Sequence, residues 1–297
     1  VIVGQEQTVD LVLTAILANG HVLIEGVPGV AKTLLARLTA RLIDADFSRV
    51  QFTPDLMPSD VLGTTVFNMK TNGFDFHQGP IFADIVLVDE INRAPAKTQA
   101  ALFEVMEERQ ISIDGTTHRM GDLYTILATQ NPVEQEGTYK LPEAQLDRFL
   151  MKITMDYPSL EEEVNILERH HTNAALVKLD DIVPAITKEE LLSLRAFMNQ
   201  VFVDRTLLQY IALIVQQTRT SKAVYLGASP RASVAMLQSS KAYALLQGRD
   251  FVTPEDIKFV APYVLQHRLI LTAEAEMEGY SPVKVTQRLI DKVEVPK

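Results

Sequence analysis

A glycine-rich turn between an apolar run and a helical run constrains the fold of this chain most. The turn, Gly26-Val27-Pro28-Gly29-Val30-Ala31-Lys32-Thr33, follows the apolar run 21–25 and precedes good helix formers from Leu34 onward. In this layout the backbone N–H groups and the helix N-terminus face an anion, and Lys32 adds a point charge. The pattern predicts a phosphate-binding loop in which the Thr33 hydroxyl binds Mg²⁺. The alternative is an ordinary strand–helix turn.

The loop departs at one position from the pattern G-x-x-x-x-G-K-[ST]. Ala31 stands where the pattern has its last glycine. A single methyl group is compatible with such a loop if φ at this residue is negative.

Composition excludes several classes of protein. The 297 residues suffice for one large domain or two modest ones, and 47% hydrophobic and 22% charged residues are typical of a globular protein. No apolar stretch approaches the ~20 residues that a transmembrane helix needs. The absence of cysteine excludes disulfides and thiolate metal sites and fits a reducing compartment, so we expect a cytoplasmic protein. The net charge of −10 argues against a protein that wraps duplex DNA.

The hydrophobic pattern changes character near Pro158. Before it, apolar runs predict five strands buried on both faces, at 21–25, 49–53, 85–89, 123–129 and 149–155. Helical periodicity lies between them at about 5–18, 32–43 and 96–109. After it, the pattern is helical, at 159–171, 187–201, 204–220, 229–247, 253–268 and about 282–292. We therefore predict an α/β domain over 1–157, with a parallel sheet between helices, and a smaller all-α domain over 158–297.

Two segments inside the first domain predict β-hairpins. Residues 61–78 alternate apolar and polar side chains around Thr71-Asn72-Gly73, and residues 110–120 turn at Asp114-Gly115. The hairpins are either surface decorations or extensions toward a partner or a central pore.

Polar side chains follow two of the predicted strands. Asp89 and Glu90 end the run 85–89, at the edge where a doubly wound sheet collects its ligand-binding groups. Paired with the glycine loop, Asp89 would hold the hydration shell of Mg²⁺ and Glu90 would orient the attacking water. Asn131 follows the next strand and could hydrogen-bond the water or the γ-phosphate, or it forms a simple Asn-Pro turn.

Two arginines have a functional and an ordinary interpretation. Arg148 follows Leu146-Asp147 and could be a solvated helix-end charge. Arg231 lies in the first turn of a predicted helix, where a cation opposes the macrodipole, so it needs a phosphate or a nearby carboxylate as partner.

These motifs, in this order, resemble those of AAA+ ATPases, and most closely those of the MoxR family. The glycine loop, including Ala31, is similar to that family's own variant. Further stretches that fit are 79–83, 89–95, 102–110, 129–132 and 141–149. The resemblance covers nearly the whole chain, is strongest from 21 to 155, and implies a P-loop αβα core of five parallel strands followed by a helical lid.

The resemblance also implies roles for individual residues. Asn131 would be the sensor 1 residue and Arg148 the finger that reaches the ATP of a neighbouring subunit, with Arg93 and Arg109 as rivals. Arg231 would be the sensor 2 arginine, acting within its own subunit or on a neighbour. Thr33 and Asp89 would hold Mg²⁺, and Glu90 would position the water. The ATP-binding loop would comprise Gly26, Val27, Pro28, Gly29, Val30, Ala31, Lys32, Thr33 and Leu34.

As to partners, the resemblance implies a homo-oligomeric ring, expected to be a hexamer, with active sites at subunit interfaces. It also implies a chaperone that remodels or matures a client protein complex, often by inserting a metal or cofactor, with a von Willebrand A-domain protein. Two alternatives stay open: an MCM-like or chelatase-like motor, and an assembly scaffold that binds ATP with negligible hydrolysis. A DNA-directed motor is disfavoured, because the hairpins set only Lys70 against Asp75, and His118 and Arg119 against Asp114.

Overall fold

The computed structural model describes residues 3–27, 29–131, 138–139, 141–172 and 179–296. The chain divides into two compact units. The first comprises Val1–Val9, His21–Leu141 and Thr154–Leu192, and the second comprises Asp10–Gly20, Pro142–Ile153 and Ser193–Lys297. The domain boundary expected near residue 157 stays a prediction.

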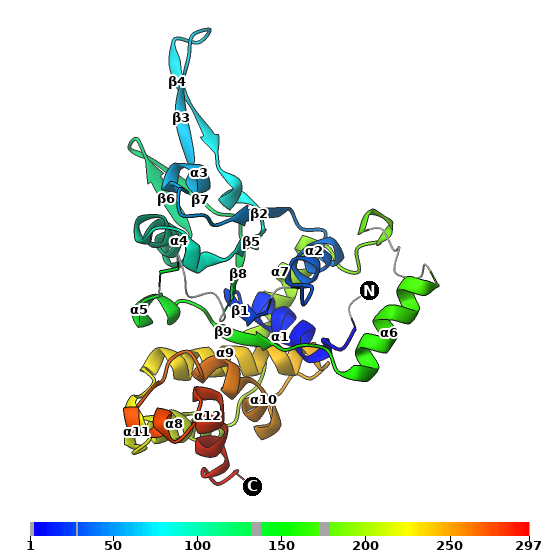
Figure 1. Cartoon of the computed structure of the whole chain (residues 1–297), viewed down its shortest axis with the longest axis vertical. Coiled ribbons are helices and arrows are strands. Elements are labelled where there is room, and N and C mark those ends of the chain that lie inside the picture. The colour runs from blue at the N-terminus through cyan, green and yellow to red at the C-terminus, as the bar shows by residue number, and fades with distance from the viewer. Residues whose placement is uncertain (1–2, 28, 132–137, 140, 173–178, 297) are drawn as a thin grey trace. The chain divides into compact units, whose positions relative to one another are not determined.

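A five-stranded parallel sheet forms the centre of the α/β part, as the apolar runs predict (Figure 1). Its order is β2 (Phe47–Gln51), β5 (Ile85–Asp89), β8 (Thr125–Gln130), β1 (Val22–Gly26) and β9 (Met151–Met155). The first of these strands lies two residues earlier than expected, because its pairing with β5 starts with Phe47 opposite Ile85. β5 is buried along its whole length, which explains its continuous aliphatic sequence.

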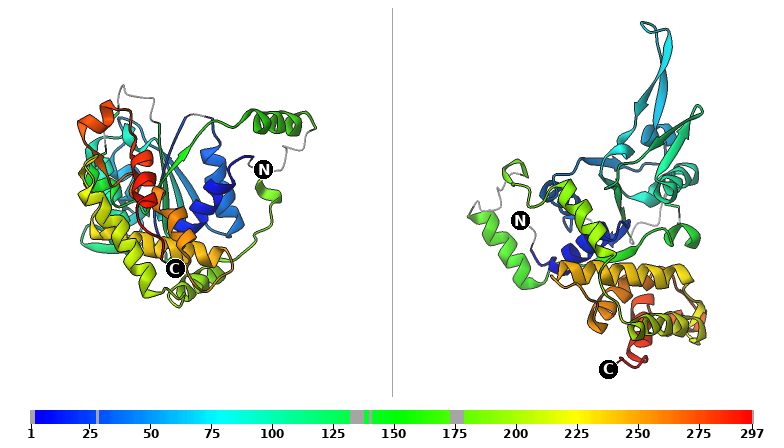
Figure 2. Two further views of the ribbon diagram at one scale, coloured as in Figure 1. Left: turned by 90° about the horizontal axis from the view of Figure 1, so that it is seen from below. Right: turned by 180° about the vertical axis from the view of Figure 1, so that it is seen from behind.

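Helices cover both faces of this sheet. α2 (Lys32–Leu42) and α4 (Ala96–Glu108) lie on opposite sides of it (Figures 1 and 2). The buried ring of His21 ties β8 to α4, since Nδ1 accepts from Ile126 N at 2.9 Å and Nε2 donates to Met106 O at 3.2 Å. This histidine is therefore a structural residue of the core.

Two antiparallel hairpins lie where the sequence predicts them. β3 (Gly63–Asn68) pairs with β4 (Gly73–Gln78), and this hairpin extends away from the sheet (Figure 1). β6 (Gln110–Ile113) pairs with β7 (Thr116–Arg119). The hairpins meet through an aromatic contact, because the ring of His118 lies 4.2 Å from the ring of Phe76.

The second unit is a bundle of helices that pack on one another. They are α8 (Arg205–Thr220), α9 (Pro230–Leu246), α10 (Pro254–Leu265) and α12 (Pro282–Asp291). The structure adds a feature that the helical periodicity did not predict, a short antiparallel pair of β10 (Val224–Leu226) and β11 (Ile270–Leu271). Each of these strands is too short to produce a detectable alternation.

The remaining elements are short or connect these layers. They are α1 (Glu6–Leu17), α3 (Pro58–Leu62), η1 (Pro80–Phe82), η2 (Ile91–Arg93), α5 (Glu143–Leu146), α6 (Leu160–His171), η3 (Leu179–Asp181), α7 (Lys188–Met198) and α11 (Ala273–Met277). Among the described residues, no helix is both long and apolar enough to cross a bilayer.

Candidate nucleotide site

The glycine loop connects β1 to α2, as the sequence predicts. Gly26 lies against the backbone of β9, where a Cβ atom would come within 2.7 Å of Met155 O, so a larger side chain does not fit. Lys32 donates from Nζ to Gly26 O at 2.6 Å, which folds the lysine back across the loop. Gly29 has φ +87°, a conformation that glycine adopts freely. Of the predicted loop residues, Pro28 lies outside the described residues.

Ala31 differs from its expected conformation. The sequence analysis expects a negative φ at Ala31, but the structure gives φ +60° and ψ 24°. Ala31 is thus a non-glycine residue in the left-handed region, which costs about 1–2 kcal/mol. It is also the N-cap of α2 and makes no side-chain hydrogen bond to the first turn. The N–H groups of that turn therefore lack a side-chain cap at this position, which suits an anion.

The other loop residues divide by burial. Val30 is buried, whereas Val27, Thr33 and Leu34 are partly exposed. Thr33 is thus a partly exposed hydroxyl-bearing residue in the first turn of α2, where a ligand of Mg²⁺ near a bound phosphate would lie.

The acid pair lies at the carboxyl end of β5. Asp89 is buried, and Glu90 follows it with φ +56° and ψ 53°, a left-handed conformation that turns the chain out of the strand. Thr129 on the neighbouring β8 contacts both residues. Its hydroxyl donates to Asp89 Oδ1 at 3.2 Å and accepts from Glu90 N at 3.0 Å.

Two side chains of β2, which the sequence analysis missed, hold these carboxylates. Arg49 Nε lies 2.6 Å from Asp89 Oδ2, and Gln51 Nε2 donates to Glu90 Oε2 at 2.8 Å. The sequence carries one local signal of this role, the spacing of Arg49 and Gln51, because residues two apart in a strand point to the same face. Arg93, a rival finger candidate, lies with its Nε 3.1 Å from Glu90 Oε2 of its own chain.

Strand order brings the loop and the acid pair to one edge of the sheet. β8 lies between β1 and β5, with Ile24 opposite Thr129 and Val88 opposite Ala128. Asn131, directly after β8, is buried at 6% exposure. The structure therefore collects Gly26, Asp89 and Asn131 at the ends of three adjoining parallel strands.

The donor set fits Mg²⁺ better than a metal held by protein alone. Among the described residues, no group of three or more His, Asp or Glu side chains could hold a metal ion. Mg²⁺ commonly takes one or two protein oxygens together with substrate phosphates and waters. Thr33 and Asp89 are such oxygen donors.

The remaining predicted arginines lie in different surroundings. Arg109, the other rival finger, ends α4 and donates from Nη1 to Tyr124 O at 3.0 Å, and burial lowers its pKa. In the second unit, Arg231 Nε lies 4.0 Å from Asp147 Oδ2. A nearby carboxylate, one of the two partners expected for Arg231, is therefore present. Arg148 follows Asp147, the C-cap of α5, and is partly exposed.

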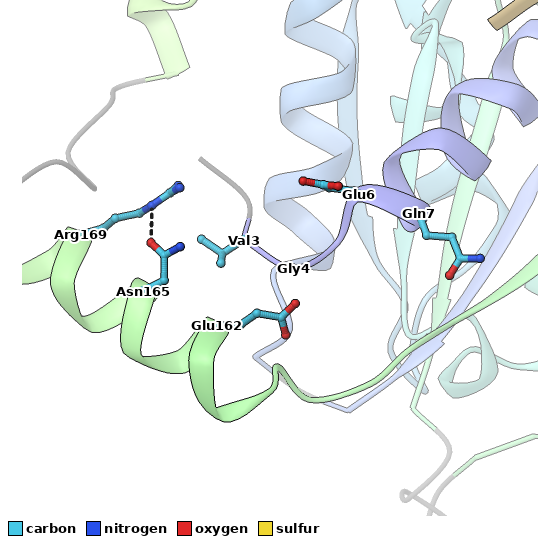
Figure 3. A pocket seen from close by; sticks show the side chains of 7 residues that line it. All are labelled: Val3, Gly4, Glu6, Gln7, Glu162, Asn165 and Arg169. Atoms are coloured by element: carbon cyan, nitrogen blue, oxygen red, sulfur yellow. Dashed lines mark hydrogen bonds between the residues drawn. The ribbon is translucent and has the colours of Figure 1, made fainter. Parts of the chain in front are cut away.

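A separate pocket of about 550 Å³ lies in the first unit between the N-terminal segment and α6 (Figure 3). Arg169 donates from Nε to Asn165 Oδ1 at 2.9 Å on its α6 side. No predicted site residue is among the described residues that line it, which are Val3, Gly4, Glu6, Gln7, Glu162, Asn165 and Arg169.

Comparison with known proteins identifies relatives of both parts of the chain. Residues 21–151 match the model of the ATPase family associated with various cellular activities (AAA), and residues 216–291 match the AAA lid domain. Protein YeaC of Bacillus subtilis is 48% identical over 296 residues, covering 100% of this chain and 92% of that protein. Chaperone MoxR1 of Mycobacterium tuberculosis is 44% identical, covering 100% of this chain and 80% of that protein. A crystal structure of a protein from Cytophaga hutchinsonii superposes with a TM-score of 0.91 at 42% identity, covering 100% of this chain and 92% of that one.

Proposed function

The chain belongs to the MoxR family of AAA ATPases, and from this premise we propose that it is a ring-forming chaperone driven by ATP hydrolysis at the glycine loop. One observation carries the proposal. The loop after β1, the acid pair after β5 and Asn131 after β8 lie on adjoining strands, and Thr129 bonds to both members of the acid pair. At one edge of the sheet, this arrangement places a positive charge, a carboxylate that can bind the metal and a second carboxylate that can orient the attacking water.

Each side chain has a role that its position supports. The backbone N–H groups of the loop and Lys32 would bind the phosphates, and Thr33 and Asp89 would hold Mg²⁺. When bound, Mg²⁺ neutralises charge that develops on the phosphates. Glu90 orients the attacking water, and Asn131 contacts the water or the γ-phosphate. Gln51 and Arg93 both contact Oε2 of Glu90, so they restrict the orientation in which this carboxylate meets the water.

Hydrolysis is completed, in this proposal, by Arg148 of a neighbouring subunit. Such a finger stabilises transition-state charge and is worth about 10³-fold or more in rate. Arg93, which contacts Glu90, and Arg109, which donates to Tyr124 O, stay the rival candidates for this finger. Arg231 senses nucleotide, in its own subunit or in the next.

The output of the cycle is the remodelling of a client complex. The relative named chaperone MoxR1 supports a chaperone role. The proposal further includes a hexameric ring, a von Willebrand A-domain partner and insertion of a metal or cofactor into the client. The β3–β4 hairpin would face a partner or the central pore. It exposes Phe67, Met69 and Phe74, of which Met69 is 88% exposed.

The test is steady-state ATP hydrolysis per subunit, measured against protein concentration. We expect the rate per subunit to rise with concentration, because each site needs a neighbour's arginine. Lys32→Ala should abolish nucleotide binding, and Glu90→Gln should bind ATP without hydrolysing it. Glu276→Gln, at an exposed position of α11, is the matched control. Undiminished turnover in Glu90→Gln would contradict the role of Glu90, and absent hydrolysis in the unmodified chain would favour the scaffold alternative.

A further inference from the structure

A buried arginine just after α10 uses all of its hydrogen-bond donors. The side chain of Arg268 is 3% exposed. A guanidinium has five N–H donors, and each of those of Arg268 has an acceptor. Nε donates to Asp147 Oδ1 at 2.6 Å, Nη1 to Leu150 O at 3.1 Å and Val264 O at 2.5 Å, and Nη2 to Asp147 O at 3.2 Å and Phe149 O at 2.8 Å.

Four of these five bonds converge on one short segment, 147–150. They reach it on both sides of Arg148, at Asp147 before it and at Phe149 and Leu150 after it. Burying a charge is costly unless the charge is paired and its donors are satisfied. Burial lowers the pKa of Arg268, while the Asp147 carboxylate opposes that change and keeps the guanidinium charged. The five hydrogen bonds and the Asp147 carboxylate offset the cost of burying this charge. The same bonds fix the backbone that carries Arg148.

The residues next to Arg268 bind the same stretch of chain. His267 Nε2 donates to Phe149 O at 3.0 Å, and Gln266 Nε2 donates to Lys152 O at 2.5 Å. The side chain of Phe149 is fully buried. Three consecutive residues after α10 thus hold the chain from residue 147 to residue 152, all within the second unit.

The same carboxylate also faces the second candidate arginine. Oδ1 of Asp147 accepts a hydrogen bond from Arg268 Nε, and its Oδ2 lies at 4.0 Å from Arg231 Nε. Because Arg268 fixes the orientation of Asp147, it also fixes the side of the carboxylate that is turned to Arg231. The positions of Arg148 and Arg231 therefore both depend on the buried side chain of Arg268.

We propose that Arg268 is the positioning residue of this ATPase: it holds the 147–150 segment so that Arg148 is presented to a neighbouring subunit. This inference rests on the proposed role of Arg148 as the finger in trans. Arg268 touches neither nucleotide nor reacting atoms, so its loss should leave nucleotide binding intact. It should lower the rate at the neighbour's site by about 10²-fold, the cost typical of a small misplacement of a catalytic group.

The experiment is subunit complementation. Arg268→Gln has an intact site but a misplaced Arg148, whereas Glu90→Gln has a disabled site and a well-placed Arg148. Each is expected to hydrolyse ATP poorly alone. When the two are mixed, Arg268→Gln sites that face Glu90→Gln neighbours should regain hydrolysis. Arg268→Lys should behave like Arg268→Gln, because an ammonium group cannot make the five bonds.

A parallel mixture separates the two hypotheses. Arg148→Ala mixed with Glu90→Gln should also regain hydrolysis, and its failure would overturn the finger assignment itself. If that mixture recovers but the Arg268→Gln mixture does not, the positioning role is wrong. Wild-type turnover of Arg268→Gln alone would also overturn it. Should Arg268→Gln fail to fold, Asp147→Asn replaces it in the same mixture. This substitution removes the negative charge that pairs with Arg268 and keeps an oxygen that can accept its hydrogen bond.

Discussion

Arg49 Nε lies 2.6 Å from Asp89 Oδ2, so a strand that the loop motif does not involve supplies the counter-ion of the carboxylate proposed to hold Mg²⁺. The two residues are diagonal neighbours across the strand pair at the sheet edge: Arg49 on β2 lies opposite Leu87 on β5, and Asp89, two residues further along β5, points to the same face. The side chain of Arg49 is 51% exposed, so the pair is a solvated one of modest strength.

Arg49→Gln is expected to ease the binding of Mg²⁺, because the guanidinium and the cation compete for the same carboxylate. Loss of an ion pair whose arginine is half exposed, worth ~0.5–1 kcal/mol, should lower the half-saturating Mg²⁺ concentration about 2- to 5-fold. The measurement is binding of a fluorescent ADP analogue titrated with Mg²⁺. Arg49→Lys, which keeps the charge, is the control. An unchanged midpoint in Arg49→Gln would show that the pair does not compete with the metal.

Ala31→Gly is expected to stabilise the protein, because Ala31 has φ +60° and glycine adopts that conformation without strain. Relief of the left-handed conformation should raise the free energy of unfolding by about 1 kcal/mol. The greater conformational entropy that glycine gives the unfolded chain reduces this gain. Ala31→Val should lower it, since a β-branched side chain is more strained there. Urea unfolding measures both. Equal stability of the unmodified chain and both variants would mean that the loop relaxes around residue 31.

Gly79→Ala is expected to disturb the base of the β3–β4 hairpin. A Cβ atom on Gly79 would lie 2.2 Å from Val61 O and 2.6 Å from Gly63 N, both backbone atoms that cannot rotate away. We expect a loss of about 2–3 kcal/mol in the free energy of unfolding. Gly115→Ala is the control, since Gly115 has φ +78° but open space around it, and should cost only about 1 kcal/mol. Similar losses in the two variants would argue against close packing at the hairpin base.

His267 is expected to make stability depend on pH. Burial, reinforced by the charge of Arg268, lowers the pKa of His267 well below its ordinary 6.5. Between the lowered pKa and 6.5 the unfolded chain binds more protons than the folded chain, so stability falls as pH drops below about 6.5. The slope can reach about 1.4 kcal/mol per pH unit for one group.

The measurement is urea unfolding between pH 7.5 and pH 5. His267→Gln keeps a donor for Phe149 O and should remove this part of the slope. His171→Gln, at an exposed histidine of α6, should not. A slope that persists unchanged in His267→Gln would assign the pH dependence to other groups.

Much of the fold follows from local pattern. The continuous aliphatic run of β5 predicts a strand buried on both faces, and it is one. Asp114-Gly115 predicts a tight turn, and the structure gives both residues positive φ. Local pattern fails where an element is too short to repeat, as in β10 and β11. It fails also at Ala31, because φ of one residue depends on the loop that closes around it.

The sequence by itself determined the elements and the chemistry at their ends: a glycine turn before a helix, two carboxylates after one strand, an asparagine after the next. These are encoded within a few residues of each other, where backbone preference and hydrophobic period act directly. Only the tertiary structure decided which side chains meet. Arg49 reaches Asp89 across 40 residues and Arg268 reaches Asp147 across 121. Strand order and helix packing decide such pairs, and both depend on the burial of the whole core rather than on any local segment.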